Sequence, residues 1–229
     1  MKKIMFNDRY GLTDAVLEGK KTMTRRVIKL PDGITPSDMW NPVKDIDVRG
    51  KVYFTFDFIN CEQRDISPQY QIGEEVAIAQ KYWDLRNCDA FYEALEKADP
   101  TFPLECIQDE KGCHNKMFVK AAWMPHRIRI NNIKVERLQD ISEEDCLREG
   151  IQEYFDGWCV HGIGMTIPKG KMPPIAQTAD GKPYYSDRYR DFKFNSPREA
   201  FAVLIERISG RGTWDRNPWV FAYEFKLLQ

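Results

Sequence analysis

The chain has 229 residues, enough for one large or two small domains with a hydrophobic core that needs no disulfide or metal support. Its 34 lysines and arginines and 35 aspartates and glutamates give a net charge of −1, which argues against a histone-like or tail-driven nucleic-acid binder. With 42% hydrophobic and 30% charged residues, the composition is that of a globular protein rather than a disordered one.

We expect neither a targeting segment nor a metal site. No apolar run reaches the roughly 18 residues of a membrane helix, and no apolar stretch follows Lys2 and Lys3. We therefore expect a cytoplasmic protein with no membrane partner. The six cysteines form no C-x-x-C pair, so we expect free thiols. The spacing around Cys113 and His114 is too irregular for zinc, and we expect neither a metal nor a cofactor.

The N-terminal fifth of the chain predicts one helix and then extended structure. Apolar spacing over 12–18 is typical of a short helix that ends at Gly19. Residues 21–28 read as extended. The stretch 30–49 is rich in proline, aspartate and glycine, and we expect it to be a loop.

The middle of the chain predicts strands and one connecting helix. Apolar and polar residues alternate over 52–58, the pattern of a half-buried strand, and 76–79 predict another strand. A surface helix is expected over 89–98 and a strand over 117–123. Residues 127–138 predict a strand whose alternation changes phase at its two asparagines, which suggests a β-bulge.

The C-terminal elements carry clear start signals. Ser142 predicts the N-cap of a short helix that ends at Gly150, with Asp145 as its capping-box partner. Ser196, followed by proline and glutamate, predicts the start of a helix that ends at Gly210. Residues 219–227 predict a final strand.

These elements indicate an α+β fold. Strands and helices mix irregularly, with no βαβ rhythm and no glycine-rich phosphate loop, so we expect a small curled β-barrel with helices at its ends. Residues 151–195 lack periodicity. Such long stretches are usually lids, binding loops or mobile segments.

The segment 19–26 combines a glycine turn with two lysines, two threonines and two arginines. A lysine with a lowered pKa can deprotonate a threonine hydroxyl, which would make the segment a candidate catalytic site. The alternative is a basic turn that leads into a surface strand. Strand alternation would place Lys21 and Thr24 on opposite faces, so a shared site requires the turn at Gly19 to persist through Lys21.

Glu149 lies at the end of the helix that Ser142 begins. The helix dipole is unfavourable for a carboxylate there and would raise its pKa, which suits a general acid. The alternative is a solvated glutamate at a helix end.

Aromatic and basic residues also alternate near the centre of the chain. Rings with interleaved cations can stack on a nucleobase, and the alternative is a core tryptophan beside a half-exposed strand. The residues concerned are Tyr82, Trp83, Trp123, His126, Arg127 and Arg129.

Four motifs follow one another in a fixed order. They are GKKTMTRR at 19–26, YQIGEEV at 70–76 with Glu74 in place of the usual aspartate, the segment 124–151 with RLQDIS and a Glu-Gly pair, and NPWV at 217–220. Together they resemble the ASCH domain, a branch of the PUA-like superfamily, and especially its larger bacterial and phage-associated members. The resemblance covers most of the chain as a single domain, 1–229, with insertions near 30–50, 84–116 and 151–195.

The resemblance implies a barrel with a cleft for RNA or a modified nucleoside. A short bacterial branch of the family is similar to amidohydrolases that remove the acyl group from N4-acetylcytidine. By this resemblance Lys21 is the base, Thr24 the nucleophile and Glu149 an acid or positioning group, and Arg26 matches an arginine of that branch. An oxyanion donor is also needed, and a backbone N–H near Lys21 is a candidate.

We therefore expect a protein that binds RNA or a modified nucleoside in a cleft lined by Lys21, Thr24 and Glu149. The other residues expected to bind the nucleic acid or nucleoside are Lys20, Thr22, Arg25, Arg26, Trp83, Trp123 and Arg127. One alternative is an amidohydrolase for N4-acylated cytidines, so enzymatic activity stays open. Another is a phage-derived interaction module that binds a protein partner through 151–195.

Overall fold

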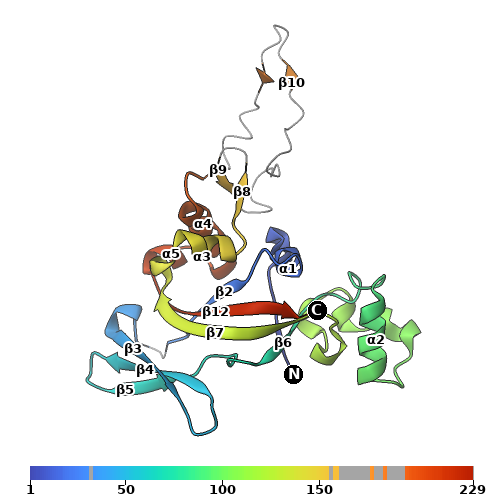
Figure 1. Ribbon diagram of the computed structural model, residues 1–229, viewed down its shortest axis with the longest axis horizontal. Helices are drawn as coiled ribbons and strands as arrows, with labels where there is room; N and C mark the ends of the chain where they lie inside the picture. The colour runs from blue at the N-terminus through green and yellow to red at the C-terminus, as the bar shows by residue number, and fades with distance from the viewer. Residues whose placement is uncertain (31–32, 155–156, 160–175, 178–182, 185–193, 229) are drawn as a thin grey trace. The chain divides into compact units, whose positions relative to one another are not determined.

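Short helices and strands alternate irregularly along the chain in the computed structural model, which confirms the expected α+β class (Figure 1). The structure describes residues 1–30, 33–154, 157–159, 176–177, 183–184 and 194–228. Most of the segment 151–195 therefore lies outside the described residues. In the described part, no helix is both long and apolar enough to cross a membrane.

The described residues fall into two compact units. The first consists of 1–7, 37–134 and 223–229, and the second of 8–36 and 135–222. The expectation of a single domain with three insertions stays a prediction.

The largest sheet has five strands in the order β1-β6-β7-β12-β2. These strands are Lys2–Ile4 (β1), Met23–Val27 (β2), Glu75–Ile78 (β6), Arg127–Arg137 (β7) and Trp219–Leu228 (β12). Strand β1 pairs parallel to β6, and β6 pairs antiparallel to β7. The order begins at β1 and ends at β2, so the described strands do not show the closed barrel that we expected.

The expected phase change in β7 is confirmed by its burial. Ile128 and Ile130 are buried, Asn131 and Asn132 are exposed, and Ile133 is buried again. The apolar face therefore continues after one extra residue.

A three-stranded antiparallel sheet in the first unit contains β3 (Met39–Ile46), β4 (Val52–Phe58) and β5 (Gln63–Ile66). The predicted strand at 52–58 is confirmed, and its apolar residues are buried. The predicted loop over 30–49 is wrong, because it contains β3. This edge strand is mostly exposed and has an irregular register between Trp40 and Val43, so it lacks the alternation that reveals a strand.

The first unit also contains the predicted helix, α2 (Asp89–Ala98), which buries Phe91 and Leu95 against aromatic residues of the core. Two 3₁₀ helices, η3 (Leu104–Gln108) and η4 (Lys111–Cys113), follow it.

The strand predicted over 117–123 is wrong. Two more 3₁₀ helices, η5 (Lys116–Phe118) and η6 (Ala121–Trp123), occupy this segment. The Lys3 Nζ donates to the carbonyls of Met117 and Val119 at 2.6 and 2.7 Å. A side chain from β1 thus binds carbonyls that a strand would direct to a neighbouring strand.

Four α-helices lie among the described residues of the second unit. They are α1 (Leu12–Leu17), α3 (Glu143–Arg148), α4 (Pro197–Ser209) and α5 (Thr213–Arg216). The predicted caps are confirmed. The Ser142 side chain accepts from the amide of Asp145, and that of Ser196 accepts from the amide of Glu199. Two antiparallel backbone pairs follow α3 in sequence: β8 (Gln152–Tyr154) with β9 (Gly157–Cys159), and β10 (Ala176–Gln177) with β11 (Pro183–Tyr184).

The RLQDIS and NPWV motifs contact each other in the second unit. The amide of Leu138, which opens the 3₁₀ helix η7 (Leu138–Asp140), donates to the carbonyl of Pro218 at 2.9 Å. The amide of Gln139 donates to Asn217 Oδ1 at 2.8 Å, and the Gln139 side chain donates to Trp214 O at 2.7 Å. These bonds fix the chain just before α3 and so help to position the end of that helix.

Candidate functional site

Lys21 lies in the turn between α1 and β2, with 2% of its surface exposed. Gly19 ends α1 in the left-handed conformation (φ +71°) that favours glycine. The Lys21 amide donates to Ala15 O at 2.8 Å, and the Thr22 amide donates to Arg148 O at 2.9 Å. The turn thus persists through Lys21, as a shared site requires. Because both amides are already bonded, neither is the oxyanion donor that we expected near Lys21.

Glu149 ends α3 beside this turn and is buried, so the alternative of a solvated glutamate is wrong. The Lys21 Nζ donates to Glu149 Oε2 at 2.6 Å and to the Glu149 carbonyl at 2.8 Å. Gly150 follows with φ +99°, and a Cβ on it would lie 3.4 Å from Leu12 and 3.7 Å from Lys21. The positive φ therefore favours glycine directly after Glu149, while a Cβ here would make only ordinary contacts with Leu12 and Lys21.

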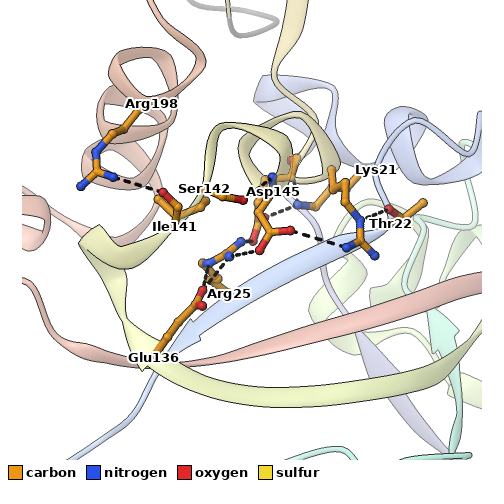
Figure 2. Close-up of polar contacts among 10 residues, drawn as sticks. Lys21, Thr22, Arg25, Glu136, Ile141, Ser142, Asp145 and Arg198 are labelled. Carbon is orange, nitrogen blue, oxygen red and sulfur yellow. Dashed lines mark hydrogen bonds and ion pairs between the residues drawn. The ribbon is translucent and has the colours of Figure 1, made fainter.

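Arg25, on β2, binds three carboxylates, and its side chain is fully buried (Figure 2). Its Nη1 lies 3.1 Å from Glu149 Oε1 and its Nη2 lies 2.8 Å from Asp145 Oδ2. Its Nε donates to Glu136 Oε1 at 2.7 Å. The sequence suggested that Arg25 binds a ligand, whereas these contacts give it a role within the protein.

The sequence did not single out Glu136, Asp145 or Arg148 as site residues. Asp145 drew notice only as a capping partner, although it lies four residues before Glu149 and so on the same face of α3. Arg148 lies 3.5 Å from Asp145, and its Nε donates to the Thr22 hydroxyl at 3.3 Å. The one available signal was this spacing of acidic residues, opposite the basic segment 19–26.

We call this group the ion cluster. It contains three cationic and three anionic side chains: Lys21, Arg25, Arg148, Glu136, Asp145 and Glu149. Burial lowers the pKa of Lys21, the nearby charges of Arg26 and Arg25 act in the same direction, and Glu149 opposes them. A lysine with a lowered pKa gives up its proton more readily, which is what a general base needs.

Thr24 follows Lys21 by three residues, and 5% of its surface is exposed. Its hydroxyl makes no hydrogen bond to the residues that the structure describes. Since side chains alternate along a strand, Thr24 projects from the face of β2 opposite Arg25. Of the three residues expected to carry catalysis, the structure joins Lys21 to Glu149 and shows no hydrogen bond from Thr24 to either.

The remaining predicted residues of segment 19–26 differ in their surroundings. Lys20 is exposed and forms an ion pair with Glu18 at 2.5 Å. The Thr22 hydroxyl accepts from Arg148, and Arg26 is half-buried on β2.

Three predicted ligand-binding residues belong to the first unit. Trp123 is 1% exposed, and its ring contacts Tyr82 and Phe102 with centroids 5.3 and 4.7 Å apart, so it packs in the core. Trp83 is 47% exposed, and the Arg86 guanidinium lies 4.7 Å from its ring centroid. The buried Nε of Arg127 has no hydrogen-bond partner among the described residues.

The cysteines that the structure places are free thiols, as predicted: Cys61, Cys88, Cys106, Cys113 and Cys146. In this same part of the chain, no three cysteine, histidine or acidic side chains form a group suited to a metal ion. The side chains of Cys159 and His161 lie outside the described residues.

Cys146, on α3, is expected to resist alkylation in the folded protein. Burial raises the pKa of Cys146 to about 12, so at pH 8 only about one molecule in ten thousand carries the reactive thiolate. The exposed Cys61 and Cys106 should react with iodoacetamide at pH 8, as peptide mass spectrometry would show. Denatured protein is the control, because Cys146 should then react as fast as they do. Rapid labelling of Cys146 in the folded state would contradict its burial.

Comparisons with protein-family models, with curated proteins and with solved structures find no match to this chain. The motifs and the geometry of the ion cluster are therefore the basis for inferring a function.

Proposed function

We propose that this chain is an ASCH-type protein with a PUA-like fold that binds N4-acylated cytidine nucleosides and hydrolyses their acyl amide. The observation that carries the proposal is the buried pair of Lys21 and Glu149, 2.6 Å apart. A lysine with a lowered pKa beside a carboxylate can accept a proton and return it later in a reaction. Contacts between the motifs in the second unit, such as that of Gln139 with Asn217, also favour a common fold.

The proposed reaction has two steps. The reaction requires ligand binding to bring the Thr24 hydroxyl within reach of Lys21, because the structure shows no hydrogen bond between them. Neutral Lys21 then takes the hydroxyl proton, and the oxygen attacks the acyl carbonyl of the nucleoside. The bond from the carbonyl carbon to N4 breaks, and Lys21 returns the proton to N4, so that cytidine leaves and the acyl group stays on Thr24. Lys21 then takes a proton from water, and the hydroxide attacks the ester carbonyl. The bond from the carbonyl carbon to the Thr24 oxygen breaks, Lys21 returns the proton to that oxygen, and the carboxylic acid leaves.

The charge balance of the ion cluster favours a small ligand over a long polyanion. Its three cations face three anions, so the cluster offers no excess positive charge to a phosphate backbone. Lys21, Thr24 and Glu149 are 2%, 5% and 4% exposed, so a ligand has to displace covering groups to reach them. An uncharged nucleoside meets both conditions better than RNA does.

The test is an assay of cytidine release from N4-acetylcytidine, followed by chromatography. Wild-type protein should release cytidine, and Thr24→Ala should lower the rate by about a thousandfold or more, because the nucleophile is lost. Thr22→Ala is the matched control, since it removes a hydroxyl two residues away and should keep the rate within about tenfold.

The outcomes separate the two parts of the proposal. Full activity of Thr24→Ala would exclude Thr24 as the nucleophile. No release by the wild type from any N4-acylated cytidine would overturn the hydrolase assignment.

Binding without hydrolysis is the second candidate function. It is favoured by the first unit, where half-exposed Trp83 lies beside Arg86, a combination that stacks on nucleobases. RNA binding through such residues should weaken as salt rises, because phosphate contacts release counterions. Titration with a single-stranded RNA at two salt concentrations, repeated with Trp83→Ala, would test it. Binding that ignores both salt and the substitution would exclude it.

A further inference from the structure

Arg25 is the centre of the ion cluster, and its donors bind three separate carboxylates. Glu136 comes from β7, Asp145 from α3 and Glu149 from the end of α3. The guanidinium is planar and rigid, so three contacts in different directions fix both its position and its orientation. Arg25 is therefore held in one orientation, and its contact with Glu149 fixes the position of that carboxylate.

The two oxygens of the Glu149 carboxylate bind two different cations. Its Oε1 accepts from Arg25 at 3.1 Å and its Oε2 accepts from Lys21 at 2.6 Å. Arg25 thus takes part of the carboxylate charge that would otherwise bind the Lys21 proton, and its own positive charge repels that proton. Both effects make Lys21 easier to deprotonate.

We infer that Arg25 is a positioning residue for the Lys21–Glu149 pair: it fixes Glu149 by one oxygen and shares that carboxylate with Lys21, which leaves the lysine proton free to transfer. The inference rests on the proposed function for its catalytic meaning. The effect of Arg25 on the Lys21 titration can be measured without any substrate.

The charges that act most strongly on Lys21 are those of Glu149, Arg26 and Arg25, and other charged groups lie on the neighbouring elements. On β2 these are Arg25 and Arg26, and on α3 and its end Asp145, Arg148 and Glu149. Glu136 lies on β7 and Arg198 on α4, while Asp14, Glu18 and Lys20 belong to α1 and the turn after it. Variants at Arg25 and Glu136 change this balance in opposite senses without touching Lys21 or Glu149.

The experiment follows the titration of Lys21 by NMR, from the ¹³Cε shift of selectively labelled lysine assigned with Lys21→Arg. Arg25→Gln should lower the acid dissociation constant of Lys21 by about tenfold or more, because a neighbouring cation is lost. Glu136→Gln should raise that constant, because Arg25 then gives more of its charge to Glu149. A structural role alone would not shift one lysine in opposite directions. Arg25→Lys keeps the charge and is the conservative variant to measure if Arg25→Gln does not fold.

Two results would overturn the inference: an unchanged Lys21 titration in folded Arg25→Gln, or shifts of the same sign in Arg25→Gln and Glu136→Gln. Circular dichroism identifies the folded variants, and the Glu136→Gln measurement stands if Arg25→Gln does not fold. The proposed function is judged separately by cytidine release from the wild type. If the wild type releases cytidine, the rise of rate with pH should move to higher pH in Arg25→Gln and to lower pH in Glu136→Gln.

Discussion

Replacing Lys21 with methionine is expected to reduce the release of cytidine from N4-acetylcytidine by about a thousandfold or more. Methionine resembles the lysine stem in length but carries no proton acceptor, so it removes the chemistry while filling much of the space. The substitution leaves Glu149 bound to Arg25 at 3.1 Å, which limits the loss of stability. The rate is measured by chromatography at saturating substrate, with Tm recorded in parallel.

Lys20→Met is the matched control for this substitution. Lys20 precedes Lys21 directly but is exposed and paired with Glu18, so its loss should change the rate by less than about twofold. Equal rates for Lys21→Met and wild type would exclude Lys21 as the base. Similar losses in both variants would point to the positive charge of the turn rather than to proton transfer.

The role of Lys21 as the base also predicts how the rate of cytidine release depends on pH. Lys21 acts as a base only when neutral, so the rate should rise with pH through its pKa. Burial lowers that pKa from its usual value of 10.5, so the rise should occur below the pH at which an exposed lysine titrates.

The folded state also binds the Lys21 proton less tightly than the unfolded state does. Lys21 therefore makes stability rise with pH between its folded pKa and 10.5.

Local signals in the sequence predicted most of the helices. Ser142 and Ser196 bond to the amides three residues ahead, and Gly19 ends α1 with a positive φ. These interactions involve only neighbouring residues, so the sequence contains all the information that determines them. The strand β4 was predictable for a similar reason, because its alternation reflects one buried face.

The two wrongly predicted segments, the loop over 30–49 and the strand over 117–123, have a common physical cause. Strand β3 is mostly exposed and has an irregular register, and it becomes a strand through its pairing with β4. The segment 117–123 has strand-like residues, but Lys3 binds two of its carbonyls from a distant part of the chain. Long-range contacts decide both cases, and propensity does not report them.

The candidate site was partly predictable. The resemblance to the ASCH domain assigned a common site to Lys21 and Glu149, and the structure places their side chains in contact. It did not indicate that Glu136, Asp145 and Arg25 would complete the cluster, because that depends on how β2, the end of β7 and α3 are arranged. The contact of Thr24 with the pair stays a prediction.

Replacing Arg25 with methionine is expected to destabilise the protein by about 3–5 kcal/mol, the typical loss when one partner of a buried ion pair is removed. The fully buried guanidinium binds Glu136, Asp145 and Glu149, so its loss leaves their negative charges with too few partners. Thermal unfolding followed by circular dichroism should show a Tm lower by roughly 6–20 °C for a chain of this size.

Arg129→Met is the control for this loss of stability, because it removes an ion pair that is exposed to water. Arg129 also pairs with a carboxylate, Glu75, at 2.7 Å, but their side chains are 51% and 40% exposed. Water screens such a pair, so its loss should cost about 1 kcal/mol or less. Equal stability of the two variants would show that the ion cluster is hydrated rather than buried. The pKa of Lys21 would then lose its main cause, so this comparison also tests the environment on which the proposed chemistry depends.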